Sequence, residues 1–147
     1  MRFTVLAIGK IKEQYLRDAI SDYSKRLSRF AQIEVIELPE GKSVKEEGES
    51  QLKRLPEKAY IVALDLAGKE IDSPKLAGLI DKTATDGYSH ICFVIGGAEG
   101  ISPEITDRAD FRFCMSKLTF THQMARFILF EQLYRAEKII NNEAYHK

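Results

Sequence analysis

The sequence is poor in the residues that build metal centres and disulfide frameworks. It has two cysteines and three histidines in 147 residues. Cys92 and Cys114 fall in apolar segments, where a free cysteine usually behaves as a small buried hydrophobic residue. Neither belongs to a Cys-x-x-Cys pair, and His90, His122 and His146 lack the close spacing of zinc motifs. We therefore expect no metal site.

Long apolar runs, low-complexity tracts and internal repeats are also absent. The longest apolar runs fall well short of the roughly 18 residues that a membrane-spanning helix needs. The N-terminus lacks the apolar stretch and cleavage site of a signal peptide. With 44% hydrophobic and 30% charged residues, the composition is typical of a soluble globular protein, which we expect to be cytoplasmic and to have no membrane partner. The length predicts a single domain, residues 1–147.

The chain has no net charge, which taken alone argues against a nucleic-acid partner, because phosphate binding requires a basic surface. The distribution of charge changes this interpretation. Residues 1–29 carry seven Lys or Arg against three Asp or Glu, and residues 111–147 carry six against three. If the fold brings the two ends together, they form a positive face; scattered solvated charges are the alternative.

Hydrophobic patterns predict strands that alternate with helices. The predicted strands span residues 2–9, 33–38, 59–66, 90–97 and 111–116. The predicted helices span residues 12–30 and 122–140, and two others begin near Ser73 and Ser102. Continuous apolar runs are typical of strands covered on both faces, so we predict an α/β fold with a mostly parallel sheet flanked by helices.

Two segments between these elements lack a regular pattern. Residues 40–58 have few apolar side chains and two glycines, which predicts a mobile loop that leads into a short helix. Gly68 and Lys69 are predicted to turn the chain over after the strand at residues 59–66.

The last predicted helix has apolar residues on every side of its wheel. These residues are Met124, Phe127, Ile128, Leu129, Phe130, Leu133, Tyr134 and Ala136. A terminal helix with no polar face needs more cover than its own sheet supplies, and we expect a symmetric homodimer to provide it. Arg135 can pair with Glu131, four residues earlier, inside that interface.

Three loops follow predicted strands: Leu64–Lys69, Ile95–Gly100 and Ser116–Arg126. Open parallel sheets bind ligands at the carboxyl ends of their strands. Gly96 and Gly97 allow backbone groups to approach a ligand closely, although a glycine pair is equally typical of a plain turn. The sequence GGAEG matches neither the dinucleotide fingerprint nor the phosphate-binding loop.

The loops and the segments after them carry a specific resemblance. From VLAIGKIKEQYL and YSKRL through LDLAGK, FVIGGAEGIS, KLTFTHQMAR and EQLYRA to the terminal YHK, the whole chain resembles the ribosomal large subunit methyltransferase H family. These are small SPOUT methyltransferases that methylate N3 of a pseudouridine in 23S ribosomal RNA. The resemblance implies an α/β fold with a C-terminal trefoil knot, S-adenosylmethionine as cofactor, and a homodimer that acts on 23S rRNA within the ribosome.

Carried over by motif position, the resemblance implies a cofactor slot formed by the knot loops. The implied contacts are Leu64, Gly96, Gly97, Met115, Ser116, Lys117, Leu118, Thr119 and Phe120. Leu64, Leu118 and Phe120 suit the apolar walls of an adenine pocket, and backbone groups at the strand ends suit the edge of the base.

The resemblance also gives the end of the chain a role, because in similar proteins the C-terminal tail of one subunit lies by the cofactor pocket of the other. Tyr145 would stack on a flipped-out base, His146 would accept the N3 proton, and Lys147 would hold phosphate. From composition alone, a frayed polar end is the alternative.

Some residues keep two interpretations. Arg126 and Arg135 either bind RNA phosphate or hold the dimer together through carboxylates. We expect His122 to be structural rather than catalytic. Thr121 and Lys147 stand where many family members have proline and arginine, and lysine loses the bidentate geometry of arginine. For the function as a whole, the alternatives are a knotted methyltransferase for transfer RNA and a ribosome-associated binding factor without a catalytic step.

Overall fold

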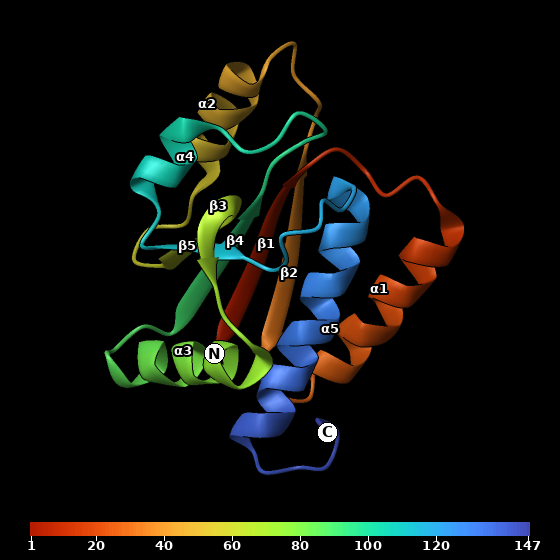
Figure 1. Ribbon diagram of the computed structural model, residues 1–147, viewed down its shortest axis with the longest axis vertical. Helices are drawn as coiled ribbons and strands as arrows, with labels where there is room; N and C mark the ends of the chain where they lie inside the picture. The colour runs from red at the N-terminus through yellow and green to blue at the C-terminus, as the bar shows by residue number, and fades with distance from the viewer.

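The computed structural model describes residues 1–147, in which five strands alternate with five helices (Figure 1). The elements are β1 (Arg2–Ile8), α1 (Gln14–Leu27), β2 (Gln32–Leu38), α2 (Val44–Arg54), β3 (Tyr60–Glu70), α3 (Ser73–Thr85), β4 (His90–Ile95), α4 (Pro103–Arg108), β5 (Phe111–Cys114) and α5 (His122–Ile140). The predicted alternation is confirmed.

The strands form one sheet in the order β2-β1-β4-β3-β5, and every pair is parallel. Val5 of β1 lies between Val35 of β2 and Phe93 of β4 in the register. Because all strands run the same way, their carboxyl ends lie at one edge of the sheet, which is the upper edge in Figure 1. We call this the carboxyl edge, and the opposite one the amino edge.

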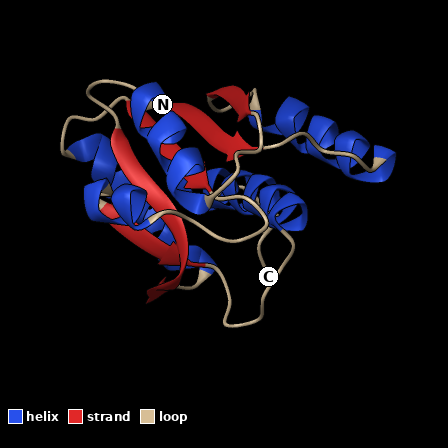
Figure 2. Cartoon of the chain, turned by 90° about the horizontal axis from the view of Figure 1, so that it is seen from above, coloured by secondary structure: helices blue, strands red, loops and turns tan.

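Alternate residues of the strands face two separate layers of helices. Phe3 and Val5 of β1 and Phe93 of β4 belong to the larger core, which α1, α3 and α5 complete. Leu6 of β1 and Val94 of β4 point the other way, toward α2 and α4. Figure 2 shows helices on both faces of the sheet. Burial on both faces explains why the strands have continuous apolar runs.

The segment that was predicted to be mostly loop, residues 40–58, contains the three-turn helix α2. The hydroxyl of Ser43 caps this helix by accepting a hydrogen bond from the Glu46 backbone N–H at 3.1 Å. The carboxylate of Glu46 in turn accepts from the Lys42 backbone N–H at 3.2 Å. The predicted short helix is therefore present, but it begins earlier than expected, at Val44, and it directs the polar side chain of Gln51 into the core.

The predicted turn at Gly68 and Lys69 is also wrong, because β3 continues to Glu70. Its pairing with β5 is interrupted between Leu64 and Lys69, and residues 65–68 bulge out of the ladder. The chain resumes the strand afterwards. The bulge lies at the carboxyl edge, where it forms part of the cavity described below.

The last helix is covered more completely than a surface helix. It packs between α1 and α3, and none of its residues is fully exposed. Two helices of the same chain therefore supply much of the cover that its apolar residues require. No helix in the structure combines the length and hydropathy needed to cross a bilayer.

Candidate functional site

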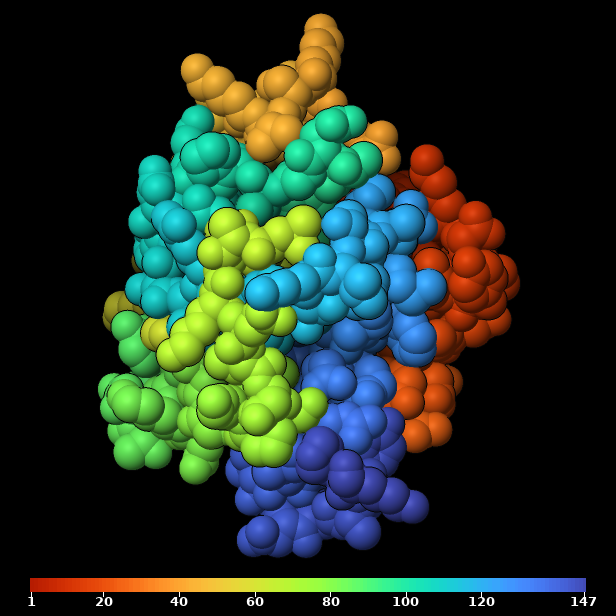
Figure 3. All heavy atoms as spheres, in the orientation of Figure 1, coloured from red at the N-terminus to blue at the C-terminus, as the bar shows by residue number.

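A cavity of about 1000 Å³ opens at the carboxyl edge of the sheet. Its walls are the β3 bulge, the loops after β4 and β5, and the first residues of α1 and α5. In Figure 3 the β3 bulge in yellow-green, the loop after β4 in green and the loop after β5 in cyan meet on the upper half of the molecule. Segments far apart in the sequence thus enclose one space.

The structure brings together almost all residues that the sequence assigned to the cofactor. Those that line the cavity are Leu64, Gly96, Gly97, Met115, Ser116, Leu118, Thr119 and Phe120. Lys117 does not line it; its amino group lies in solvent, 3.7 Å from the carboxylate of Glu70. The backbone N–H of Leu118 donates to the hydroxyl of Ser116 at 3.0 Å, which fixes the turn after β5.

Gly96 leaves no space for a side chain. A Cβ at this position would lie 2.3 Å from the carbonyl oxygen of Gly100 and 2.6 Å from the backbone nitrogen of Ile101. The loop folds back on itself here, because the Gly100 N–H donates to the Gly97 carbonyl at 3.1 Å. Glycine at position 96 is therefore required by the close approach of two backbone segments.

Helix α2 packs against this glycine loop, a contact that the sequence analysis did not predict. The side-chain amide of Gln51, 1% exposed, donates to the carbonyl of Ile95 at 2.9 Å. A Cβ on Gly97 would lie 2.8 Å from the Glu47 carboxylate, so this side chain packs directly on the loop. The signal that predicts the helix is the capping pair of Ser43 and Glu46, a Ser-x-x-Glu box.

The start of α5 supplies the other side of the cavity. The hydroxyl of Thr121 caps the helix by accepting from the Met124 N–H at 3.1 Å, so threonine at this position serves as a helix cap. The ring nitrogen Nε2 of His122 is buried and has no hydrogen-bond partner in the protein. Since His122 lines the cavity, this nitrogen is a polar group without a protein partner at the site.

The C-terminal tail is folded against its own chain. The hydroxyls of Tyr145 and Tyr23 lie 3.1 Å apart, and the Tyr145 ring meets the Tyr134 ring edge-on at 4.9 Å. The guanidinium of Arg135 covers the Tyr145 ring at 4.7 Å and contacts Nδ1 of His146 at 3.2 Å. These contacts contradict the alternative of a frayed end.

The tail and the cavity are at opposite ends of α5. Neither Tyr145 nor His146 lines the cavity. The 19 residues of α5 separate the two places by about 28 Å at a rise of about 1.5 Å per residue. Figure 1 shows the start of α5 at the top and the C-terminus at the bottom. The tail of a chain in this arrangement does not contact its own cavity.

Arg126 is in the protein interior and not on an RNA-accessible surface. It is 2% exposed, forms an ion pair with Glu37 of β2, and donates to the carbonyl of Gly9 at 3.0 Å. A phosphate cannot reach this guanidinium unless the ion pair breaks. The carboxylate partner is within the same chain, so the structure offers a third role: Arg126 joins the start of α5 to the ends of β1 and β2.

Removing the carboxylate partner of Arg126 should destabilise the fold. We expect Glu37→Gln to lower the free energy of unfolding by about 2–3 kcal/mol, because it leaves a buried guanidinium unpaired. Denaturant unfolding measures the change. Glu34→Gln, in the same strand, is the control: its partner Arg2 is exposed, so a loss below about 1 kcal/mol is expected. Equal losses in the two variants would contradict the structural role of Arg126.

Arg135 is placed differently from Arg126. Its guanidinium pairs with the Glu131 carboxylate at 2.7 Å, which confirms the predicted pairing four residues apart. The same guanidinium contacts Tyr145 and His146. Arg135 therefore holds the tail, with part of its side chain still reached by solvent.

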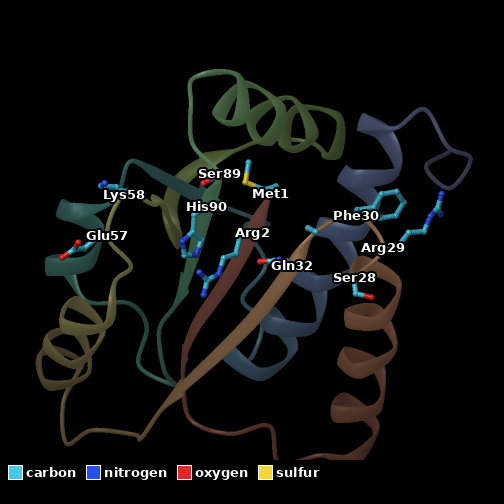
Figure 4. A pocket seen from close by; sticks show the side chains of 11 residues that line it. Met1, Arg2, Ser28, Arg29, Phe30, Gln32, Glu57, Lys58, Ser89 and His90 are labelled. Carbon is cyan, nitrogen blue, oxygen red and sulfur yellow. The ribbon is translucent and has the colours of Figure 1, made fainter.

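A second cavity, of about 630 Å³, lies at the amino edge (Figure 4). Figure 4 shows Arg2 and His90 side by side at the start of β1 and β4. Both of its arginines are already paired, Arg2 with Glu34 at 2.7 Å and Arg29 with Glu143 at 2.5 Å. Burial, followed by the charge of Arg2, lowers the pKa of His90. The arginines of this cavity are thus neutralised by carboxylates beside it, and Lys58 is its unpaired cation.

Comparison with known protein families identifies the family of the chain that contains the cavity at the carboxyl edge. A family model described as predicted SPOUT methyltransferase matches residues 1–146. The chain belongs to the SPOUT methyltransferases. It is therefore a methyltransferase, and the methyl donor of this family is S-adenosylmethionine. An enzyme is favoured over the non-catalytic binding factor.

Similar proteins align with this methyltransferase over its full length. The ribosomal RNA large subunit methyltransferase H of Ruminiclostridium cellulolyticum is 47% identical, and the protein of the same name from Clostridium perfringens is 45% identical; both alignments cover 100% of each chain. A putative ribosomal RNA large subunit methyltransferase H from Methanococcus maripaludis is 42% identical with the same coverage.

Solved structures confirm the fold of the methyltransferase. TrmJ from Z. mobilis superposes with a TM-score of 0.53 at 9% identity, over 92% of this chain and 70% of that one. The tRNA (m1G37) methyltransferase from Aquifex aeolicus also gives 0.53, at 15% identity, over 92% and 69% of the two chains. At these identities the likeness concerns the fold alone.

The methyltransferase has no group of three or more His, Cys, Asp or Glu side chains arranged to hold a metal ion. Both cysteines are free and buried. Burial raises the pKa of the Cys92 thiol to about 12, so it stays protonated at neutral pH. Cys92 belongs to the smaller of the two cores.

Proposed function

We propose that the chain catalyses transfer of a methyl group from S-adenosylmethionine to N3 of a pseudouridine in 23S rRNA of the large ribosomal subunit. The observation that carries this proposal is the cavity at which the β3 bulge and the loops after β4 and β5 meet. It occurs in a chain that aligns end to end with relatives named ribosomal RNA large subunit methyltransferase H. A substrate in the ribosome implies action in the cytoplasm.

The residues of the cavity fit the methyl donor. A volume of about 1000 Å³ is at the upper end of the usual range for small-molecule sites. Leu64, Leu118 and Phe120 offer apolar walls for adenine, and the glycine loop leaves backbone groups accessible beside them. When bound, the donor supplies an activated methyl group on a positively charged sulfur.

We assign the proton chemistry to the tail of a second subunit. Burial, and then the hydrogen bond with Tyr23, raise the pKa of Tyr145 to about 12, so Tyr145 is a neutral phenol at physiological pH and cannot serve as the base. A guanidinium only donates hydrogen bonds, so Nδ1 of His146 is the acceptor in its contact with Arg135. Once the tail leaves Arg135, Nδ1 is free to take the N3 proton.

The positions of the tail and the cavity support a homodimer. Each chain holds its cavity at one end of α5 and its tail at the other. An antiparallel pair of chains would place the tail of each beside the cavity of the other, with Tyr145 against the target base and Lys147 and Arg135 near phosphate. The trefoil knot that the family resemblance implies is part of the same proposal. Three chain segments that enclose one cavity are compatible with such a knot.

Radiolabelled S-adenosylmethionine tests the reaction. We expect the purified protein to transfer label to 23S rRNA in ribosomes that lack the modification, and to leave purified transfer RNA unlabelled. Mapping the label by mass spectrometry should locate it on a pseudouridine. Label on transfer RNA alone would favour a transfer-RNA methyltransferase, and ribosome binding without label would favour a non-catalytic factor; either result overturns the proposal.

A further inference from the structure

The segment between β1 and the first turn of α1 is an unassigned part of the cavity rim. Glu13, Tyr15 and Leu16 line the cavity together with the three loops. Tyr15 is 65% exposed, although aromatic rings are usually covered. Figure 3 shows this segment in red along the side of the molecule, next to the start of α5 in blue.

Two lysines precede this tyrosine with their charges unpaired. Lys10 and Lys12 are exposed, and neither takes part in an ion pair. Three other cations of the basic N-terminal region do form ion pairs. These pairs are Arg2 with Glu34, Arg26 with Asp22 and Arg29 with Glu143. Lys10 and Lys12 therefore keep unpaired positive charge in the segment that leads into the cavity rim.

Hydrogen bonds fix the segment at several points. The Arg17 guanidinium donates to the carbonyls of Ile11 and Lys12 at 2.8 and 2.9 Å. The Lys12 N–H donates to the side-chain oxygen of Gln123 in the first turn of α5, at 3.0 Å. At the other end, buried Arg126 holds the carbonyl of Gly9. The lysines and Tyr15 are thus presented on a rigid support that is tied to the cavity wall.

We propose that Lys10, Lys12 and Tyr15 form an RNA-contact surface for the unpaired nucleotides that flank the methylated one. The lysines bind backbone phosphates, and the exposed ring of Tyr15 stacks on a base, the combination with which proteins bind single-stranded RNA. This inference rests on the proposed function for its substrate. The charge of the surface selects a polyanion over a second copy of this chain, which has no net charge.

Ribosome binding at varied salt tests the surface directly. We expect Lys10→Gln combined with Lys12→Gln to weaken binding to ribosomes that lack the modification, and to lower the slope of log affinity against log salt by about 2, one unit for each lost phosphate contact. Tyr15→Ala should weaken binding about tenfold to a hundredfold with an unchanged slope, because stacking is not a counterion effect. Calorimetry should give an S-adenosylmethionine affinity close to wild type for the lysine variant.

Matched controls come from the opposite edge of the sheet. Lys58 lines the cavity at the amino edge and is also exposed and free of ion pairs. Tyr88 is 36% exposed and packs edge-on against Tyr60. Lys58→Gln and Tyr88→Ala remove the same chemical groups far from the proposed surface. We expect both to bind ribosomes as the wild type does.

The outcomes separate this inference from the proposed function. If the wild type binds and methylates ribosomes and the Lys10, Lys12 and Tyr15 variants do so equally well, the surface assignment is wrong and the function stands. If sedimentation shows that these variants lose affinity only because they no longer dimerise, the surface is a subunit contact and the inference is again wrong. If the wild type methylates no ribosomal RNA, the proposed function fails, while the salt slopes still decide whether this surface binds RNA.

Discussion

Replacing Gly96 by alanine is expected to abolish binding of S-adenosylmethionine. The added methyl carbon would lie 2.3 Å from the Gly100 carbonyl oxygen, far inside the sum of their van der Waals radii. The neighbour is backbone and cannot rotate away as a side chain does. The loop after β4 must then open, which displaces the wall that we propose holds the adenine. Calorimetric titration should detect no heat of binding at concentrations that saturate the wild type.

A control for this variant is Gly78→Ala in α3. A Cβ at Gly78 would meet no atom within 4 Å. Alanine in the middle of an exposed helix is expected to stabilise the protein by about 0.5–1 kcal/mol and to leave cofactor binding unchanged. Circular dichroism should show that both variants retain the helices. If Gly96→Ala binds S-adenosylmethionine as the wild type does, the glycine loop is not part of the cofactor site.

The fold could be predicted from the sequence because burial on both faces leaves a strong pattern. The runs around Val5 and Phe93 are apolar at consecutive positions, which only covered strands tolerate, and the helices between them show three- and four-residue spacing. Helix α2 was predicted only as a short helix at the end of a mobile loop. Its buried residues are Gly48 and Gln51, and Leu52 is only partly buried against the smaller core, so the segment lacks a strong apolar stripe that would show its full length.

The position of the candidate site could be predicted from the sequence. The ion-pair partners of its basic side chains could not. Which residues gather at the carboxyl edge follows from the parallel topology, because the loop after each strand begins there. Which carboxylate pairs with an arginine depends on the tertiary fold. Arg126 and Lys12 look equally basic in the sequence, yet the fold buries the first against Glu37 and leaves the second exposed and unpaired next to the cavity rim. Charge counts along the sequence cannot distinguish such cases.

Deleting Tyr145, His146 and Lys147 is expected to abolish methylation and to leave S-adenosylmethionine binding unchanged. None of these three residues lines the cavity, so the truncated protein keeps every wall of the proposed cofactor site. It loses the phenol of Tyr145 and the imidazole of His146, which we propose accepts the N3 proton. Full methylation by the truncated protein in the labelled assay would show that the tail has no part in the reaction.

A mixed dimer decides whether the tail acts on its own chain or on its partner. One subunit carries Gly96→Ala and keeps its tail, and the other lacks residues 145–147 and keeps its cavity. With two affinity tags, only the mixed species is purified. If the tail acts across the dimer, the mixed species has one complete site of two, and we expect roughly half of the wild-type rate, although both parent homodimers are inactive. If each tail serves its own cavity, neither site is complete and the mixed dimer is inactive as well. The position of the tail, a full helix length from the cavity of the same chain, favours the first result.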